Sequence, residues 1–365
     1  PDIWEVLKGL LRRLGMEYDL IKCERLQPLH VEESPCSIED AKAGDAFVVF
    51  SRKDVFFYQE MLAKRGLSTA IIYGALGPEV RRSEAQRFRS GEAKVLIATD
   101  AIGMGLNLPI ARMIFTTMEK FDGIEVGPIA PALVKQIAGR AGRFGQFPDG
   151  YVGAIDVDAL AYVRRCLSLN TKEVPQKLGV APPVEQLTLL AKEMQIAHPS
   201  RALIAWRTKL LLSDAHFFAA PMFERVELSI EMEEHFPALS FEEIARLSMV
   251  PLPKVLAVKQ ILFTWLQVFD DAKRSPKSEK MVRWAPSNEQ VINLGLAEAE
   301  NLYHTASMYC WLARSFPDVF VGEQQAQDTR TMVADHLIEL LRARARALIV
   351  LNQGRKMKVK PVLER

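Results

Sequence analysis

The stretch VLIATDAIGMGLNLP, residues 95–109, decides the fold class of this chain. Its first four residues, Val95 to Ala98, form a short and continuous apolar run, as expected for a parallel strand that is covered on both faces. Polar residues and two glycines, Gly103 and Gly105, follow the run. Because glycine permits tight backbone turns and close approach by a partner, the stretch predicts a buried strand that ends in a binding loop.

The sequence on either side of this stretch repeats the alternation of strand and helix. Apolar runs predict four further strands, and segments opened by proline or closed by glycine predict three helices between them. The expected strands are 46–50, 70–73, 113–116 and 151–155, and the expected helices are 54–65, 78–90 and 131–141. Strands separated by single helices predict an α/β fold with a doubly wound parallel sheet, in which ligands bind at the carboxyl ends of the strands.

Three of the expected strand ends carry residues that suit phosphate binding. Thr99 ends the quoted strand, and its hydroxyl can hold a nucleic-acid phosphate without base preference. Ser51 and Arg52 follow the first strand, and Gly74 follows Tyr73 at the end of the second. Each position also has an ordinary structural interpretation, because a serine before a helix is commonly a cap and a strand-end tyrosine is commonly buried.

A second informative segment is QIAGRAGR, residues 136–143. Its two Gly-Arg steps place Arg140 and Arg143 three residues apart, on one face at the end of a helix. Guanidinium groups match phosphate oxygens bidentately, and an arginine over a transferring γ-phosphate can raise the rate by roughly 10³–10⁵. The alternative is a pair of exposed arginines whose positive charge is favourable at the negative, C-terminal end of the helix dipole.

Composition narrows the class of protein. Hydrophobic residues make up 49% of the 365 residues, and 47 basic against 45 acidic residues give a net charge of +2. This balance supports a globular core but gives no sign of a nucleic-acid partner in bulk charge, so such a partner has to meet a local basic surface.

The four cysteines lie far apart without a CxxC pair, which argues against a zinc site or disulfide framework and fits a reducing compartment. The longest apolar region, 250–269, contains prolines and lysines and predicts a core helix, not a membrane span.

Helices are expected to dominate after about residue 157. Capping-box spacing at 240–243 and at 287–290 predicts two helix starts. Long helices are expected at 287–316 and 329–351, and the polar segment 270–280 predicts a linker or an exposed loop. Tryptophans at apolar helical spacing in this region are expected to be core residues.

Taken in order, the segments VVFSR (48–52), ATDAIGMGLNLP (98–109) and QIAGRAGR resemble the fourth, fifth and sixth motifs of superfamily-two helicases of the DExH type. The run RLQPL at 25–29 and the helical region behind the motor narrow the resemblance to the suppressor-of-Var family of RNA helicases. These are the helicases of the mitochondrial RNA degradosome, with bacterial relatives. The resemblance is specific from about 44 to 156 and looser to about 320.

The resemblance implies roles around the nucleotide. Arg143, and with it Arg140, are implied to act as arginine fingers on ATP that is bound by a preceding RecA-like domain. Gln136 is implied to lie near the γ-phosphate or its attacking water, and Gly105 and Asn107 near the nucleotide. The expected cofactors are therefore ATP and Mg²⁺.

The resemblance also implies RNA as the partner. Thr99 is implied to hold an RNA phosphate, with Ser51, Arg52 and Gly74 lining the same track. It further implies unwinding in the 3′-to-5′ direction, cooperation with an exoribonuclease, and a location in the mitochondrial matrix or the bacterial cytoplasm. No membrane partner is expected.

The chain lacks a GxxxxGK[ST] loop and a DExH segment, which the family carries in its first motor domain. Without that phosphate cradle and magnesium-binding carboxylate, the chain alone is expected not to hydrolyse ATP. It also begins with Pro1 and no initiator methionine, which suggests a fragment. The expected domains are a remnant of the first RecA-like domain at 1–40 with a strand at 18–23, a second RecA-like domain at 41–160, a helical domain at 161–275, and a C-terminal helical region with a basic tail at 276–365.

Two other classes of function stay open at this point. One is a non-catalytic RNA- or protein-binding adaptor that has inherited a RecA-like scaffold. The arginine pair argues against it, because an adaptor has no need of γ-phosphate sensors. The other is a DNA helicase of another DExH family, which the motor motifs alone do not exclude.

Overall fold

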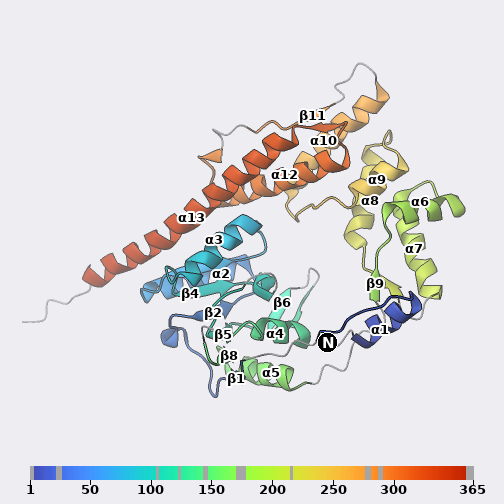
Figure 1. Ribbon diagram of the computed structural model, residues 1–365. Coiled ribbons are helices and arrows are strands. Elements are labelled where there is room, and N and C mark those ends of the chain that lie inside the picture. The colour runs from blue at the N-terminus through green and yellow to red at the C-terminus, as the bar shows by residue number, and fades with distance from the viewer. Residues whose placement is uncertain are drawn as a thin grey trace, which may run out of the picture. The chain divides into compact units, whose positions relative to one another are not determined.

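The computed structural model describes residues 4–21, 27–103, 107–121, 125–142, 147–169, 178–213, 217–275, 281–286 and 291–358 (Figure 1). The chain divides into two compact units. Unit 1 combines residues 1–19 with 172–333, and unit 2 combines residues 20–171 with 334–365. The stretch at 95–109 and the arginine segment both belong to unit 2.

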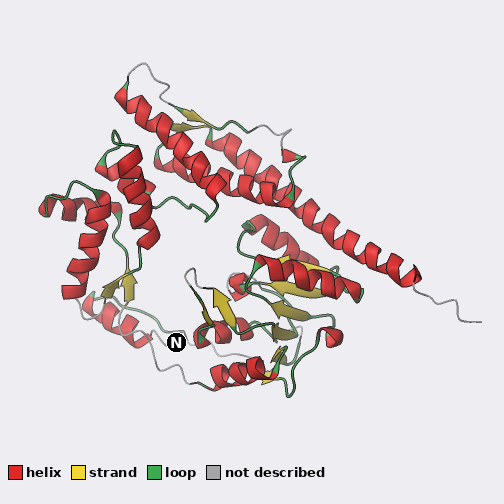
Figure 2. Ribbon diagram, turned by 180° about the vertical axis from the view of Figure 1, so that it is seen from behind, coloured by secondary structure: helices red, strands yellow, loops and turns green. Residues whose placement is uncertain are grey.

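Unit 2 is built on a six-stranded sheet whose strand pairs are all parallel. The strand order is β1-β8-β5-β2-β4-β3. The strands are β1 Leu29–Val31, β2 Asp45–Val48, β3 Thr69–Ile72, β4 Val95–Ala98, β5 Arg112–Phe115 and β8 Gly150–Ala154. The helices that connect them are α2 Arg52–Lys64, α3 Pro78–Arg89 and α4 Pro131–Ala138, and α5 Val157–Ser168 follows the last strand, β8. Figure 2 shows these helices on both faces of the yellow strands.

The apolar runs become strands because both faces of the sheet are covered. Every residue of β2, β3 and β4 is buried. Alternate residues point to opposite faces: Phe47 stacks on Tyr58 of α2 at 5.8 Å on one face, and Val48 packs in the cluster that includes Val134 and Ile137 of α4 on the other. The expected parallel sheet is confirmed, with each predicted strand found within two residues of its expected bounds.

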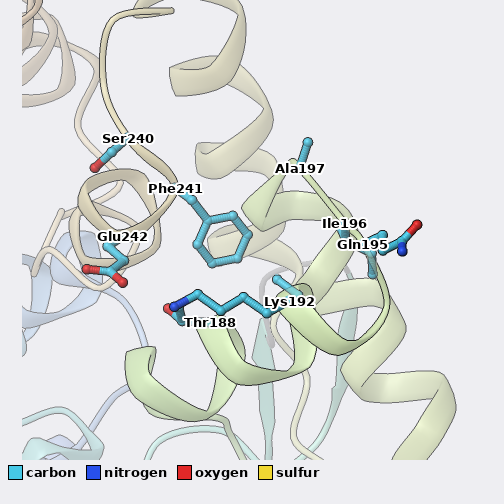
Figure 3. Close-up of a pocket in the computed structure, with 9 residues that line it drawn as sticks. Thr188, Lys192, Gln195, Ile196, Ala197, Ser240, Phe241 and Glu242 are labelled. Carbon is cyan, nitrogen blue, oxygen red and sulfur yellow. The ribbon is translucent and has the colours of Figure 1, made fainter.

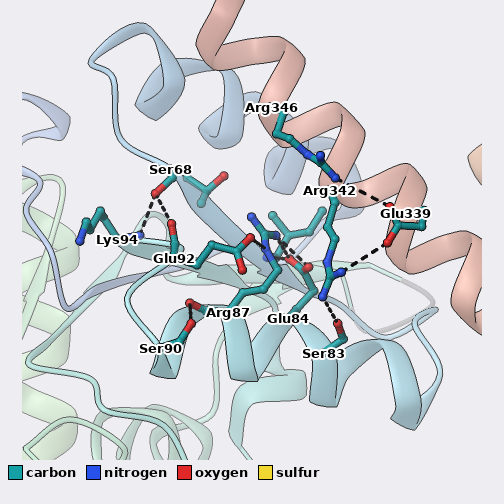
Figure 4. A network of polar contacts seen from close by, with 12 residues as sticks. Ser68, Ser83, Glu84, Arg87, Ser90, Glu92, Lys94, Glu339, Arg342 and Arg346 are labelled. Atoms are coloured by element: carbon teal, nitrogen blue, oxygen red, sulfur yellow. Dashed lines mark hydrogen bonds and ion pairs between the residues drawn. The ribbon is translucent and has the colours of Figure 1, made fainter.

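The carboxylate of Glu84 in α3 accepts a backbone hydrogen bond from the edge strand β3. The backbone N–H of Ile71 donates to Glu84 of α3 at 2.9 Å, and the Arg87 guanidinium pairs with the same carboxylate at 2.8 Å (Figure 4). Burial raises the pKa of Glu84, and the positive charge of Arg87 acts in the opposite direction. An open edge would expose unpaired backbone groups, so this buried pair protects the end of the sheet.

Unit 1 is mostly helical. Its helices are α1 Trp4–Arg13, α6 Val184–Glu193, α7 Pro199–Ser213, α8 Phe223–His235, α9 Phe241–Leu247, α10 Leu256–Arg274 and α12 Leu296–Ser315, together with the first residues of α13 Glu323–Lys358. Short parallel pairs join β9 Leu178–Val180 to β10 Phe217–Ala219 and β11 Val282–Arg283 to β12 Phe320–Val321. The rings of Trp265 and Trp284 lie 5.0 and 5.1 Å from that of buried Tyr309, so these tryptophans, which were expected in the core, are partly buried and pack against it.

The sequence misjudged three segments. Residues 18–21 form no strand, and the rest of that prediction includes residues outside those described. The expected linker at 270–280 is wrong at its start, because residues 270–274 end α10 and the buried carboxylate of Asp270 accepts the N–H of Ala238 at 2.7 Å. The long helix expected at 287–316 is interrupted, because Val291 is helical but a turn follows at 292–293. Helix α12 begins at Leu296, where the Glu298 carboxylate accepts the N–H of Gly295 at 2.9 Å, and the proposed cap at 287–290 lies outside the described residues.

The capping box at Ser240 is confirmed. Its hydroxyl accepts the N–H of Glu243, and the Glu243 carboxylate accepts the N–H of Ser240 at 2.7 Å. The helix expected at 329–351 is also present but longer, because α13 runs from Glu323 to Lys358. Its residues from Ala334 onward group with the sheet of unit 2.

Sequence reasoning missed several short elements of unit 2. These are the edge strand β1 and the antiparallel hairpin of β6 Glu119–Phe121 and β7 Val126–Pro128. Each has only three residues, which is too short for a periodic signal.

Candidate functional site

The candidate site lies at the carboxyl edge of the sheet of unit 2. Ser51 follows β2, Thr99 follows β4 and Gly74 follows β3, and these strands are neighbours in the order β2-β4-β3. The strand ends are locked in register, since the N–H of Val49 donates to Ala98 and the N–H of Thr99 donates to Ile72, both at 2.9 Å. The sheet therefore brings residues that are far apart in the chain to one edge.

Within this edge, the hydroxyl of Ser51 caps α2. It accepts the N–H of Asp54 at 3.0 Å and donates to the Asp54 carboxylate at 2.6 Å. This is the ordinary interpretation of a serine before a helix, and it stabilises the helix by about 1 kcal/mol. Thr99 is buried, and its hydroxyl accepts the N–H of Ala101 at 3.4 Å.

The second polar group at this edge is built around Arg52. Its guanidinium lies 5.3 Å from the ring centre of Phe56 and 5.8 Å from that of Tyr73. Arg52 is exposed, whereas Tyr73 is only 2% exposed, so the tyrosine has the buried position that a strand-end aromatic commonly takes. The carbonyl of Gly74 accepts a hydrogen bond from Arg81 of α3 at 2.6 Å.

The arginine segment joins the same region through the end of α4. Gln136 and Arg140 both donate to the carbonyl oxygen of Gly103, at 3.3 Å from Gln136 Nε2 and 3.0 Å from Arg140 Nε. Gly103 ends the short 3₁₀ helix Asp100–Gly103, which directly follows Thr99. One backbone carbonyl therefore ties the glutamine and the first arginine of QIAGRAGR to the loop after β4.

The second glycine of this segment is required by close packing. Gly142 has a φ of +65°, and a Cβ atom added there would lie 2.3 Å from the backbone nitrogen of Gly150 in β8. Its own N–H donates to Ile110 at 2.8 Å, beside the isolated parallel bridge between Ile110 and Ala141. Only a residue without a side chain fits here, so the arginine segment is seated directly against the sheet.

Two of the predicted nucleotide-site residues, Gly105 and Arg143, lie outside the described residues. Asn107 is exposed, and its carbonyl accepts a hydrogen bond from Arg89 of α3 at 2.8 Å. The structure thus brings together Gln136, Arg140 and the loop that follows Thr99, and it does not place the second finger.

Sequence reasoning missed the residues that brace this edge. Arg81, at the start of α3, bonds the carbonyl of Gly74, and Lys120 of the β6–β7 hairpin pairs with Asp100. Arg89 lies at the other end of α3, where it bonds the carbonyl of Asn107 near the amino end of the sheet. The signal for Arg81 was the run of arginines on the helix that begins at Pro78, but sequence periodicity does not indicate which carbonyl an arginine contacts.

Two cavities among the described residues contain none of the predicted site residues. One, of about 510 Å³, lies in unit 1, where the ring of Phe241 points from the start of α9 toward Thr188 and Lys192 of α6 (Figure 3). The other, of about 400 Å³, lies at the amino end of the sheet and includes Arg89 and Phe147. Within the parts of the chain that the structure describes, no cluster of metal ligands is present and no helix has the length and apolarity to cross a membrane.

Comparison with known proteins agrees with this arrangement. Residues 24–145 match the helicase conserved C-terminal domain, and residues 296–343 match the C-terminal domain of the ATP-dependent RNA helicase SUV3. The first match contains every predicted site residue. Together with the parallel sheet and its flanking helices, it confirms a RecA-like fold followed by a helical C-terminal region.

Relatives of the chain are similar to it over almost its full length. The mitochondrial DExH-box ATP-dependent RNA helicase DExH18 of Arabidopsis thaliana is 30% identical over 93% of the chain and 44% of its own length. The mitochondrial ATP-dependent RNA helicase SUV3 of Saccharomyces cerevisiae is 29% identical over 90% of the chain and 46% of its own length. The chain therefore spans less than half the length of these relatives.

A solved structure of the C-terminal domain of the DEAD-box protein Dbp5 matches 39% of the chain at 19% identity, with a TM-score of 0.32. The family is given instead by the two domain matches, which occur in the order of the chain, and by the relatives. The chain belongs to the SUV3 family of helicases, of which it carries the helicase conserved C-terminal domain and the SUV3 C-terminal domain.

Proposed function

We propose that this chain forms the second motor domain and C-terminal region of an ATP-dependent RNA helicase that unwinds RNA duplexes. The observation that carries the proposal is the joint hydrogen bonding of Gln136 and Arg140 to the carbonyl of Gly103. It couples a guanidinium suited to phosphate with the loop that follows Thr99, the residue proposed to hold RNA. Coupling of this kind is what a motor needs, because the state of the nucleotide must alter the grip on RNA.

On this proposal, ATP binds between this domain and a preceding RecA-like domain. Arg143 and Arg140 stabilise the charge that develops on the transferring γ-phosphate, and Gln136 orients the phosphate or its attacking water. Gly105 and Asn107 lie beside the nucleotide. The preceding domain supplies the phosphate cradle and most of the Mg²⁺ coordination, so the chain by itself does not hydrolyse ATP.

The RNA track on this proposal follows the strand ends. Thr99 and the backbone around Gly74 contact phosphates, and Arg52 supplies positive charge at the exposed start of α2. Ser51 shapes the turn, since its hydroxyl already serves Asp54, and it contacts RNA through the backbone. Contacts to phosphates alone would give binding with little sequence preference and strong salt dependence.

The family relation suggests a biological setting for this activity. We propose unwinding in the 3′-to-5′ direction during RNA degradation or surveillance, together with an exoribonuclease. The relatives named above are mitochondrial proteins, which favours the mitochondrial matrix over the bacterial cytoplasm for this chain.

The test is RNA-stimulated ATP hydrolysis by the complete gene product, with Arg143→Ala compared with the unsubstituted protein. We expect RNA to stimulate turnover, and Arg143→Ala to lower kcat by roughly 10³-fold or more while RNA binding persists. Arg82→Ala is the matched control, because the Arg82 side chain is 71% exposed on α3 and should leave kcat unchanged.

Other outcomes separate the alternatives. RNA binding without RNA-dependent turnover would favour a non-catalytic adaptor, and stronger stimulation by DNA than by RNA would favour a DNA helicase of another DExH family. ATP hydrolysis by the 365-residue chain alone would contradict the proposed division of work between the two motor domains.

A further inference from the structure

Arg344, in the later part of α13, makes a hydrogen bond and an ion pair with residues of α2. Arg344 Nε donates to Gln59 Oε1 at 2.9 Å, and Arg344 Nη2 pairs with Glu60 at 3.1 Å. Gln59 is itself buried and donates to Thr69 of β3 at 3.4 Å. A residue near the end of the chain therefore contacts the helix that begins at the proposed RNA track.

Arg344 also contacts the ring on which Arg52 rests. Its guanidinium lies 4.6 Å from the ring centre of Phe56, and the guanidinium of Arg52 lies 5.3 Å from the same centre. Phe56 follows Arg52 by one helical turn and meets Tyr73 edge-on at 6.0 Å. The half-buried ring of Phe56 thus makes a cation–π contact with a residue of α13 and another with a residue of the proposed track.

Neighbouring residues of α13 hold the helix at this place. Leu337, Leu341 and Ala345 recur every four residues and are buried, which is the pattern of a helix face that is packed against a partner. Arg342 donates to Ser83 of α3 at 3.4 Å, beside the buried Glu84–Arg87 pair (Figure 4). Arg344 is therefore presented to Phe56 from a helix that two other kinds of contact already hold.

We propose that Arg344 is a positioning residue for RNA binding, and that it acts on Arg52 by holding the ring of Phe56. A cation over an aromatic face restricts where the ring can turn, and the restricted ring in turn gives Arg52 a fixed platform. The C-terminal helix thereby becomes part of the RNA-binding apparatus without touching RNA. This proposal rests on the proposed function, because it assumes that Arg52 contacts nucleic acid.

The test is the affinity of the full 365-residue chain for a fluorescein-labelled single-stranded oligouridine, measured by fluorescence anisotropy at fixed salt. One exposed cation–π contact corresponds to about a two- to fivefold change in affinity. We therefore expect Arg344→Ala to raise the Kd about two- to fivefold, with Arg344→Lys nearer to the unsubstituted chain. In the Arg52→Ala background, Arg344→Ala should have no further effect, because the residue through which it acts is gone.

Two controls separate positioning from mere attachment of the helix. Arg346→Ala changes a neighbouring arginine whose side chain is 72% exposed and pairs only weakly with Glu339, at 3.7 Å. Glu60→Ala removes the ion pair of Arg344 but leaves the contact with Phe56 in place. Both variants should bind oligouridine like the unsubstituted chain.

The outcomes distinguish this inference from the function on which it rests. Absence of oligouridine binding, or binding that Arg52→Ala leaves unchanged, would overturn the RNA track and the positioning role with it. Binding that Arg52→Ala weakens but Arg344→Ala does not would overturn only the positioning role. An equal loss for Glu60→Ala and Arg344→Ala, or additive effects of Arg344→Ala and Arg52→Ala, would show that Arg344 only attaches the helix.

Discussion

Substitution of Gly142 tests whether the arginine segment packs so closely against the sheet that no side chain fits at this position. The φ of +65° places an alanine in the left-handed region, at a cost of about 1–2 kcal/mol. The added Cβ would also lie 2.3 Å from the nitrogen and 2.4 Å from the Cα of Gly150, both backbone atoms that cannot rotate away. Overpacking of this kind costs about 1–3 kcal/mol. Gly142→Ala should therefore destabilise unit 2 by about 2–5 kcal/mol in total.

Two other glycines of unit 2 separate the conformational cost from the steric one. Gly66 has a φ of +80° with no atom within 4 Å of an added Cβ, so Gly66→Ala should cost only the conformational part, about 1–2 kcal/mol. Gly74 has open space and no positive φ, so Gly74→Ala should lie within about 0.5 kcal/mol of the unsubstituted chain.

The assay is urea denaturation with a separate probe for each unit, because the two units need not unfold together. The chain has 5 tryptophans and all lie in unit 1, so their fluorescence reports on that unit alone. Amide hydrogen exchange of the β8 residues reports on unit 2. Gly142→Ala should weaken protection of β8 and leave the tryptophan transition unchanged. A loss of protection no larger than that of Gly66→Ala would refute the steric argument.

Two further predictions concern buried polar groups. Asp45→Ala should destabilise unit 2 by about 2–4 kcal/mol in urea denaturation followed by circular dichroism, because it removes the carboxylate that pairs with the largely buried Arg112 at 2.7 Å and leaves that arginine the longer pair with Glu32, at 3.3 Å. A loss below about 1 kcal/mol would contradict this. Burial raises the pKa of Tyr309 to about 12, and its hydroxyl oxygen lies 2.7 and 2.6 Å from the carbonyl oxygens of Val282 and Val321, which share its single proton. Because the folded pKa exceeds the unfolded value of about 10, this stabilisation is complete below pH 10 and is lost as the pH rises toward 12. Tryptophan-monitored denaturation should show that loss in the unsubstituted chain and a smaller one in Tyr309→Phe, and equal pH profiles would contradict the assignment.

Much of unit 2 could be predicted from local sequence. The apolar run at 95–98 became β4 without a shift, because the polar residues Lys94 and Thr99 mark its two ends. Gly66 and Gly91 end their helices with positive φ, as turn chemistry predicts. Where the local signal was weak, prediction failed. Residues 270–274 are mostly polar, yet they are helical, and the buried carboxylate of Asp270 accepts the N–H of Ala238.

The positions of the motif residues could be predicted from the sequence, but the contacts of their side chains could not. Sequence placed Ser51, Gly74 and Thr99 at strand ends, and the parallel sheet gathers them at one edge. It did not show that the Ser51 hydroxyl serves as a helix cap and that Arg52 lies over two aromatic rings. The side-chain roles at the site therefore remain proposals that substitution must test.

The sequence by itself determined the alternation of strands and helices, the parallel sheet and the family, because these depend on periodicity and on motifs read along the chain. Only the tertiary structure decided which distant groups meet: Arg140 on the carbonyl of Gly103, and Arg344 on the ring of Phe56. The physical reason is that an arginine can reach many carbonyls and rings with nearly equal energy. The choice among them is made by the packing of the whole unit.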